Sequence, residues 1–348
     1  MTKLLIYGAY GYSGRLIVAE AVRKGMRPFV AGRNEAKTKA LADQYDLPWE
    51  AFSLDETDKM DAALREMDAI LHCAGPFVHT CDLVAEACFR TQTHYLDITG
   101  EVAVFEWMAR HDKQAQAAGI MLLPGTGFDV VPTDCLAAHL KDLLPSATHL
   151  TLAFEALAGL SHGTATTAVE NLGEGGMIRK DGTLERVPSA HATRKIVFAD
   201  KPRTCVAIPW GDISTAYHST EIPNITVFVS QPPKMIRMMK ITRYLGWLLG
   251  SSPVQSYLKK RIKSGPAGPS DAKRDAAVSL VWGEAKDDKG NSVEARLTTP
   301  NGYTLTASAS VHIAQKVLNG EAKAGFMTPS LAFGKNLVTE LEGVDGFR

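Results

Sequence analysis

The sequence predicts an α/β fold: a doubly wound parallel sheet followed by a second α+β domain whose sheet is largely antiparallel. Over the first 130 or so residues, short apolar runs alternate with amphipathic helical patterns, which is typical of parallel strands joined by crossover helices. Beyond about residue 145 the strand-like runs follow one another without such helices. At 348 residues the chain is also too long for one ordinary core.

The first domain begins with the apolar run Leu4–Tyr7, which we predict to be a strand. Its other predicted strands are 28–31, 49–54, 69–73, 95–98 and 120–123. Its predicted helices are 14–24, 35–45, 60–67, 81–91, 104–118 and 132–144. Asn34 is placed to cap the helix that starts at 35.

The second domain has six predicted strands, 150–156, 195–198, 226–230, 276–283, 292–298 and 304–310. Turn signals at 288–291 and 300–302 have hairpin spacing, and a Gly/Pro/Ser-rich break at 264–270 suggests a mobile loop. A last helix is predicted over 330–341. We therefore expect a first domain at 1–135, a second at 136–325 that also serves dimerisation, and a C-terminal helical segment at 326–348 that could return to the first domain.

Composition limits the class of protein. Lys and Arg together number 38, as do Asp and Glu, so the whole chain has no charge bias toward nucleic acid. The five cysteines form no CxxC pair and no zinc-like cluster, so we expect reduced thiols and no metal site. The first apolar run is too short for a signal peptide, and none reaches the roughly 18 residues of a spanning helix. We expect a cytoplasmic homo-oligomer, such as a dimer, that acts on a small molecule.

The stretch GAYGYSG, residues 8 to 14, follows the first strand and opens the first helix. Gly8 is placed to make a tight turn, Gly11 to admit a pyrophosphate at the helix N-terminus, and Gly14 to let the helix pack on the strand. Tyr10, Tyr12 and Ser13 complete this candidate nucleotide site. Strand before, helix after and alternating units beyond favour a Rossmann-type site over a plain strand-to-helix turn.

The end of the second strand indicates which nucleotide binds. An NAD site normally has an acid there for the ribose 2′-hydroxyl, whereas this chain has Ala31-Gly32-Arg33-Asn34. The guanidinium of Arg33 suits a 2′-phosphate, so we predict NADP; the alternative is a solvated surface cation. Asp55, after the third strand, is added to the nucleotide-binding candidates.

The nicotinamide is expected outside the carboxyl ends of the central strands. Ala74, Gly75 and Pro76 follow one of these strands and are candidates for cofactor contacts. Asp97 and Glu101 follow the next, where they could position substrate or the carboxamide. The alternative for both is a structural role in turn-capping or in N-capping the next helix.

The motifs GAYGYSG, AGR, CAGPF, YLDITGE and GTGFDVVPTD, in this order and spacing, resemble the saccharopine dehydrogenase-like oxidoreductases. The branch with trans-acting enoyl reductases and saccharopine dehydrogenase-like proteins is the more similar one. The resemblance covers residues 1 to about 135 and returns more weakly in GPAGPSDAKRD and GFMTPSLAFG. It implies an NADP-type Rossmann domain, an α+β domain and an active site between them. The sequence departs from saccharopine-forming enzymes, because no carboxylate-clamping set of arginines is recognisable.

A reductase also needs a proton donor. Asp97 and Glu101 are candidates from the first domain. From the second we favour His162, because Gly159 and Gly163 on either side of it suggest a tight approach. The pair Tyr217-His218 is the second choice, and a structural role remains the alternative for each.

The segment 234–263 combines Met, Leu and Trp with regularly spaced cations. It could meet a membrane surface, line the entry of a long-chain substrate or form a subunit contact, and the plainest alternative is a helix docked on its own sheet.

The sequence thus favours an NADP(H)-dependent oxidoreductase that reduces a carbonyl or enoyl group of an apolar, lipid-like substrate. The arginines at 179, 186, 194 and 203 are scattered rather than grouped as a carboxylate site. Two alternatives stay open: a non-catalytic NADP-binding scaffold at lipid surfaces, and an amino-acid-condensing dehydrogenase.

Overall fold

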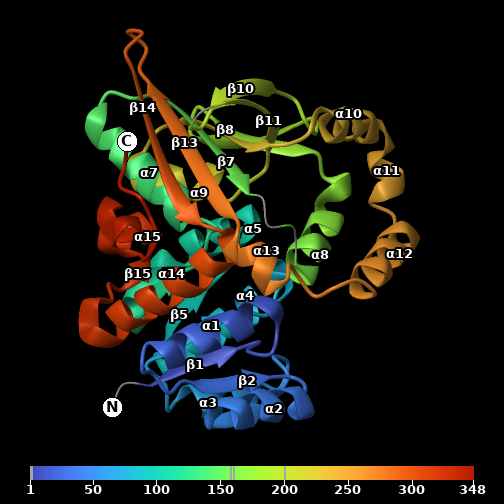
Figure 1. Cartoon of the computed structure of the whole chain (residues 1–348). Helices are drawn as coiled ribbons and strands as arrows, with labels where there is room; N and C mark the ends of the chain where they lie inside the picture. The colour runs from blue at the N-terminus through green and yellow to red at the C-terminus, as the bar shows by residue number, and fades with distance from the viewer. Residues whose placement is uncertain (1–2, 157–158, 160, 200) are drawn as a thin grey trace. The chain divides into compact units, whose positions relative to one another are not determined.

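The computed structural model describes residues 3–156, 159, 161–199 and 201–348 (Figure 1). The chain forms two compact units, each assembled from two stretches of sequence. The first contains Met1–Val131 and Tyr303–Phe333, and the second contains Pro132–Gly302 and Gly334–Arg348. The expected division at 135/136 thus falls at 131/132, and residues 303–325, expected in the second domain, lie in the first unit.

The first unit is built on a seven-stranded sheet in which neighbouring strands are all parallel, in the order β15-β6-β5-β4-β1-β2-β3. The strands are β1 (Leu4–Tyr7), β2 (Phe29–Gly32), β3 (Trp49–Ala51), β4 (Ala69–His72), β5 (His94–Asp97), β6 (Met121–Leu123) and β15 (Gly325–Phe326). Strands β1, β4 and β6 are buried along their whole length, as strands covered on both faces must be. The predicted doubly wound parallel sheet is confirmed.

Helices follow the strands of this sheet in alternation. They are α1 (Tyr12–Arg23), α2 (Glu35–Tyr45), α3 (Thr57–Leu64), α4 (Cys81–Thr91), α5 (Val102–Arg110) and α6 (Asp112–Ala118). Asn34 caps α2 as predicted, since its side chain accepts a hydrogen bond of 3.0 Å from the backbone N–H of Lys37. The single helix expected over 104–118 is instead two helices that meet at His111. The imidazole Nδ1 of His111 donates to the carbonyl oxygen of Trp107 at 2.8 Å, and this contact accompanies the end of α5.

One predicted strand is wrong: residues 304–310 belong to helix α14 (Gly302–Lys316). The β-branched and small residues there suggested a strand, but burial recurs with helical spacing at Leu305, Ala309 and Ile313. Residues 300–302 therefore lead from a strand into a helix and do not form the expected hairpin turn. Packing in the folded chain buries this face of α14, and local propensity does not report such packing.

The second unit contains a mixed sheet with the order β10-β11-β12-β7-β13-β14; β8 also pairs with β12, and β9 pairs with β8. The strands are β7 (His149–Ala156), β8 (Gly176–Lys180), β9 (Thr183–Val187), β10 (Thr193–Val197), β11 (Pro202–Ile208), β12 (Asn224–Ser230), β13 (Val278–Lys286) and β14 (Ser292–Pro300). Only the β7–β12 pair is parallel among the pairs described, so the prediction of a largely antiparallel sheet is confirmed. Strands β8, β9 and β11 were not predicted. Strand β9 is mostly exposed, so the apolar alternation that reveals a strand is weak there.

The helices of this unit are α7 (Val131–Leu143), α8 (His162–Glu170), α9 (Asp212–Thr220), α10 (Pro233–Thr242), α11 (Gly246–Leu249), α12 (Ser252–Lys263) and α13 (Asp271–Asp275). The helix predicted over 330–341 is instead α15 (Pro329–Phe333) and a 3₁₀ segment at Lys335–Glu340. Gly334, with a φ of 84°, separates the two, and the chain passes there from the first unit to the second. In the part of the chain that is described, no helix is both long enough and apolar enough to span a bilayer.

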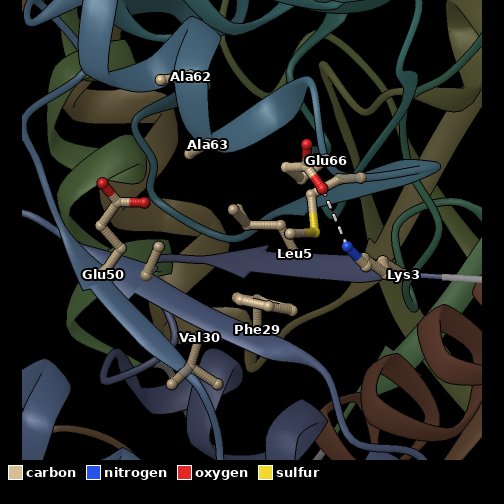
Figure 2. A pocket seen from close by; sticks show the side chains of 10 residues that line it. Lys3, Leu5, Phe29, Val30, Glu50, Ala62, Ala63 and Glu66 are labelled. Atoms are coloured by element: carbon tan, nitrogen blue, oxygen red, sulfur yellow. Dashed lines mark hydrogen bonds and ion pairs between the residues drawn. The ribbon is translucent and has the colours of Figure 1, made fainter.

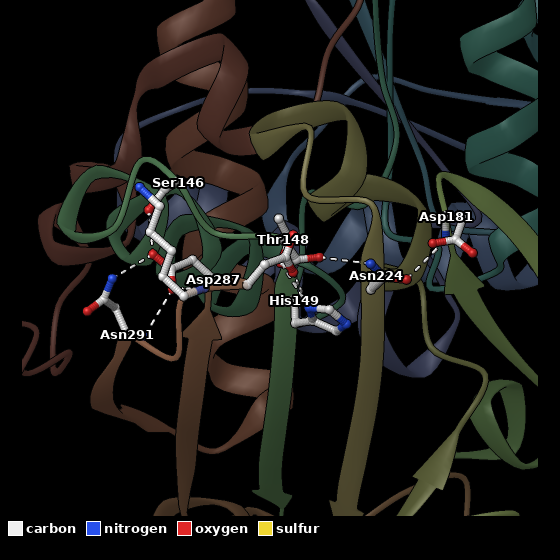
Figure 3. Close-up of polar contacts among 9 residues, drawn as sticks. Ser146, Thr148, His149, Asp181, Asn224, Asp287 and Asn291 are labelled. Atoms are coloured by element: carbon white, nitrogen blue, oxygen red, sulfur yellow. Dashed lines mark hydrogen bonds and ion pairs between the residues drawn. The ribbon is translucent and has the colours of Figure 1, made fainter.

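Polar side chains fasten one end of the second sheet (Figure 3). Asp287, at the hairpin between β13 and β14, accepts hydrogen bonds from the Ser146 hydroxyl at 2.9 Å and from the Asn291 side-chain amide at 2.8 Å. The backbone N–H groups of Lys289 and Asn291 donate to the same carboxylate at 3.0 and 2.9 Å. These contacts lower the pKa of Asp287 to about 2, the Asn291 side chain being the main cause. The predicted turn at 288–291 is confirmed.

Candidate active site

The glycine turn between β1 and α1 is too tightly packed for larger residues at two of its positions. Gly8 has a φ of 78°, and a Cβ on it would lie 2.9 Å from the Cβ of Ala74. A Cβ on Gly14 would lie 2.4 Å from the Gly8 carbonyl oxygen, so only glycine lets α1 approach the strand this closely. Gly11 is the N-cap of α1 and provides no side-chain cap. The helix N-terminus thus offers backbone amides and the positive end of its dipole to an anion, as a pyrophosphate site requires.

Cations gather at the end of β2, next to this turn. The ring of Tyr10 covers Gly32, where an added Cβ would lie 2.6 Å from the Tyr10 Cε1. Arg33 is exposed and has no hydrogen bond or ion pair with any residue that the structure describes. The Lys37 Nζ lies 5.9 Å from the centroid of the Tyr10 ring, and the sequence analysis did not single it out. Arg33 directly after β2 and Lys37 beside Tyr10 fit the 2′-phosphate of NADP better than the ribose hydroxyl of NAD.

Asp55 lies in an exposed turn after β3, the strand that neighbours β2. A hydrogen bond from the Ser53 side chain is the main cause that lowers its pKa, so it is ionised at neutral pH. Its predicted contact with the nucleotide stays a prediction.

The loop after β4 is held in place by Glu101. The Glu101 carboxylate accepts hydrogen bonds from the backbone N–H of Phe77 at 2.9 Å and of Val78 at 2.8 Å. The Phe77 ring in turn packs against Gly75, where an added Cβ would lie 3.1 Å from it. Glu101 occupies the N-cap position of α5, but its side chain makes no capping bond there. The carboxylate that we predicted to position substrate therefore fixes the loop containing Ala74, Gly75 and Pro76.

Asp97 is enclosed at the carboxyl end of β5 and has no exposed surface. Its carboxylate accepts from the Tyr95 hydroxyl at 2.7 Å and from the backbone N–H groups of Thr99 at 2.9 Å and Gly125 at 2.8 Å. Burial raises the pKa of Asp97 to about 7, against the opposing effect of these three donors. Asp97 thus joins the loops after β5 and β6, and its predicted contact with substrate stays a prediction.

Asp129 is a buried-loop carboxylate that is not among the residues predicted from the sequence. It lies in the GTGFD loop after β6, against Gly100, where an added Cβ would stand 2.6 Å from the Asp129 Oδ2. The side chain has no hydrogen bond or ion pair with any described residue, and burial alone raises the pKa of Asp129 to about 7. A carboxyl group half-protonated near neutral pH can act as a proton donor. The motif was noted for its resemblance, but only the pairing of β5 with β6 brings Asp129 next to Gly100.

Helix α14 supports the loop that carries Asp129. The Thr306 hydroxyl accepts a hydrogen bond of 3.0 Å from the backbone N–H of Phe128, and Gly127 packs directly on the Thr306 side chain. The Thr126 hydroxyl donates to the Asp97 carbonyl at 2.8 Å, and its oxygen lies 3.1 Å from the oxygen of the Ser310 hydroxyl. Helix α14, part of which was predicted to be a strand, thus fixes the loop that contains the candidate proton donor.

His162 lies in the second unit, at the first residue of α8. Its Nε2 is 3.0 Å from the carbonyl oxygen of Gly265, which can only accept, so Nε2 carries a proton. Its backbone N–H donates to the carbonyl of Ala267 at 2.9 Å. His162 therefore holds the Gly/Pro-rich segment 264–270, and its predicted catalytic role stays a prediction. Leu160, in the motif that suggested this role, lies outside the described residues.

The four arginines that could have clamped a substrate carboxylate all have protein partners. Arg194 makes a two-pronged ion pair with Glu284 at 2.8 and 3.0 Å, and Arg203 contacts Glu155 at 3.0 Å. Arg186 pairs with Glu174 at 3.3 Å. The Arg179 guanidinium donates to backbone carbonyls and lies 4.2 Å from the centre of the Tyr217 ring.

A cavity of about 330 Å³ lies elsewhere in the first unit, between β1, β2 and α3 (Figure 2). Leu5, Phe29 and Ala63 line it, and the Lys3–Glu66 ion pair of 3.1 Å stands at its side. It includes no residue of the glycine turn or of the loops after β4, β5 and β6. We therefore do not place the active site there.

The parallel sheet, the glycine turn and the cations after β2 together define a dinucleotide-binding domain of the NADP type. Residues 4–123 match the family model described as the saccharopine dehydrogenase NADP binding domain. The resemblance predicted from the motifs is thereby confirmed, and the match supports the prediction of NADP as the nucleotide of this domain.

Curated proteins with similar sequences have matching names. A saccharopine dehydrogenase-like oxidoreductase of Rattus norvegicus is 22% identical over 204 residues, which cover 51% of this chain and 48% of that protein. A trans-acting enoyl reductase of Mycobacterium leprae is 30% identical over 139 residues, covering 38% and 33% respectively. The chain thus spans about half the length of the first relative and about a third of the length of the second. These names support an oxidoreductase family.

The whole fold is similar to a solved structure. Apo saccharopine dehydrogenase (L-Glu forming) from Saccharomyces cerevisiae aligns over 98% of this chain and 96% of its own, with a TM-score of 0.66 and 12% identity. At 12% identity this likeness shows a shared fold and does not show a shared activity.

Proposed function

We propose that this chain is an NADPH-dependent reductase of a carbonyl or enoyl group in a largely apolar substrate, with Asp129 as the proton donor. The observation that carries the proposal is the partly buried, unpaired carboxyl group of Asp129 in a unit whose residues 4–123 match an NADP binding domain. NADPH, when bound, supplies a hydride. Reduction then needs one proton in addition, which the protonated Asp129 would give to the oxygen of a carbonyl or to the α-carbon of an enoyl group.

Two findings favour an apolar substrate over an amino acid. The arginines of the second unit that could bind free carboxylates are engaged by Glu155, Glu174, Glu284 and backbone carbonyls. One of the similar proteins is named as a trans-acting enoyl reductase. A hydrophobic pocket gains roughly 0.8 kcal/mol per buried methylene, so affinity should rise with the chain length of the ligand.

The proposed reductase activity is tested by measuring NADPH oxidation with enoyl, ketone and imine compounds of increasing chain length. We expect turnover of a ketone or enoyl series, with affinity that rises over several carbons. Absence of turnover with all three classes would favour the non-catalytic NADP-binding scaffold. A flat response to chain length with tight binding of glutamate or lysine derivatives would restore the amino-acid dehydrogenase.

The role of Asp129 is tested with Asp129→Asn, which keeps the shape and removes the acid. We expect kcat to fall by about 10²–10⁴-fold while the affinity for NADPH stays the same. Because only the protonated form donates, and burial raises the pKa of Asp129 to about 7, the wild-type rate should fall as pH rises through about 7. Asp58→Asn, at an exposed position on α3, is the control. Full activity of Asp129→Asn would contradict this role and make His162 the favoured candidate for the proton donor.

A further inference from the structure

The segment 233–263 exposes large apolar side chains on the surface of the second unit. Helices α10, α11 and α12 follow one another along one side of this unit (Figure 1). Trp247 is 77% exposed, Tyr244 70% and Ile241 59%. Single exposed apolar side chains are common, but a group of large apolar and aromatic side chains exposed within seven residues indicates an interaction surface.

One face of the segment packs against its own unit, and the opposite face has no such packing role. On α10, Ile236 is buried with Ala190 and Val206, and Met239 packs against the same cluster. At 100° per residue, Met238 and Ile241 point to the opposite side of the helix. Helix α11 lies against Gly173, where an added Cβ would stand 3.0 Å from the Gly250 Cα. Helix α12 is joined to α8 by the Lys259–Glu170 ion pair of 2.7 Å.

The charge of the segment has one sign. Between residues 222 and 270 the chain has eight Lys and Arg residues and no Asp or Glu, although the chain as a whole has no net charge. On α10 the cations Lys234 and Arg237 lie on the outward side with Met238 and Ile241. Arg243 stacks on Tyr244, with the guanidinium carbon 4.7 Å from the ring centre. The exposed face therefore mixes apolar, aromatic and positively charged side chains.

We propose that this face binds the surface of an anionic membrane. Aromatic side chains that are apolar in the ring and polar at the edge favour the headgroup level, and surrounding cations are attracted by anionic lipids. Ile241, Tyr244 and Trp247 enter the interface, while Lys234, Arg237 and Lys240 contact phosphates. The proposal does not depend on the reductase function, because it concerns only residues of the second unit that are remote in sequence from the NADP site.

The test is sedimentation of the full chain with vesicles of phosphatidylcholine alone and of phosphatidylcholine with phosphatidylglycerol. We expect binding to the anionic vesicles only, with release by salt, because charges are screened within about 8 Å at physiological ionic strength. Replacing Lys234, Arg237 and Lys240 by Ser should weaken binding on the order of 100-fold, at about fivefold per cation. Ile241→Ser combined with Trp247→Ser should weaken binding to a similar degree. Replacing the exposed Lys24, Lys113 and Lys289 by Ser removes the same charge elsewhere and should change binding much less.

Three results would overturn the proposal. They are no sedimentation at low salt, equal weakening by the control triple variant, and self-association of the wild type that Ile241→Ser with Trp247→Ser abolishes while vesicle binding persists. The last would identify a second copy of the chain as the occupant of this face. Circular dichroism and a melting temperature equal to those of the wild type verify that each variant is folded.

Discussion

Arg33 is the residue on which the choice of nucleotide depends. It follows β2 directly, and it has no hydrogen bond or ion pair in the described part of the chain. A cation without a protein partner has no ion pair to break when it binds a ligand phosphate, and the planar guanidinium can form two hydrogen bonds to it. Lys37 adds a second cation four residues on.

Arg33→Ala should therefore weaken NADPH binding by about 1.5–3 kcal/mol, the size of a hydrogen bond to a charged group, and leave NADH binding nearly unchanged. Fluorescence titration with both nucleotides measures the difference. Arg110→Ala, at the exposed end of α5, is the matched control and should alter neither affinity. Equal affinities of the wild type for NADPH and NADH would remove Arg33 from the site.

At the scale of elements, carboxylates that accept backbone N–H groups fix the loops. Glu101 fastens the loop after β4, Asp97 joins the loops after β5 and β6, and Asp287 closes the hairpin between β13 and β14. Each carboxylate accepts hydrogen bonds from loop N–H groups that have no partner in a helix or a sheet.

Glu101→Ala should release the loop after β4, because the N–H groups of Phe77 and Val78 then lose their acceptor. The loss should cost about 1–3 kcal/mol of local stability, seen as faster hydrogen exchange at these two amides. Glu101→Gln keeps one acceptor oxygen and should show a smaller effect. Unchanged exchange in Glu101→Ala would mean that other contacts hold the loop.

The hairpin contacts of Asp287 make a pH-dependent contribution to stability. Hydrogen bonding lowers the pKa of Asp287 from 3.8 to about 2 in the folded chain, so the contribution is complete above pH 4. It should be lost as the pH falls from about 4 through about 2, where the folded-state carboxylate takes up its proton. Hydrogen exchange at Lys289 and Asn291 should accelerate over this range in the wild type. Asp287→Ala, which removes the acceptor, should leave both amides unprotected, so that their exchange follows the intrinsic pH dependence of a free amide.

At the scale of the whole molecule, neither compact unit is a continuous stretch of sequence. Residues 303–333 return to the first unit, where β15 extends the parallel sheet beside β6 and α14 supports the loop with Asp129. The candidate NADP site consists of residues before position 132, and its sheet includes a strand from a segment far along the chain.

Residues 1–131 alone should consequently be unstable, because the edge of β6 and the apolar seat of Phe326 are then uncovered. Residues 1–131 joined by a flexible linker to 303–333 should melt cooperatively and bind NADPH. Circular dichroism and nucleotide titration compare the two with the full chain. Cooperative melting and full NADPH affinity of 1–131 alone would show that the returning segment is dispensable.

The sequence by itself determined the parallel sheet, the glycine turn and the preference for NADP. These features depend on local patterns: apolar strands, a helix that opens on glycine, and Arg33 immediately after a strand. Only the tertiary structure decided that residues 304–310 are helical, that Asp97 and Glu101 serve loops, and that Asp129 is left unpaired beside Gly100. Burial and hydrogen-bond partners depend on contacts between residues far apart in sequence, and those contacts set both the pKa of a carboxyl group and the conformation of an ambiguous segment.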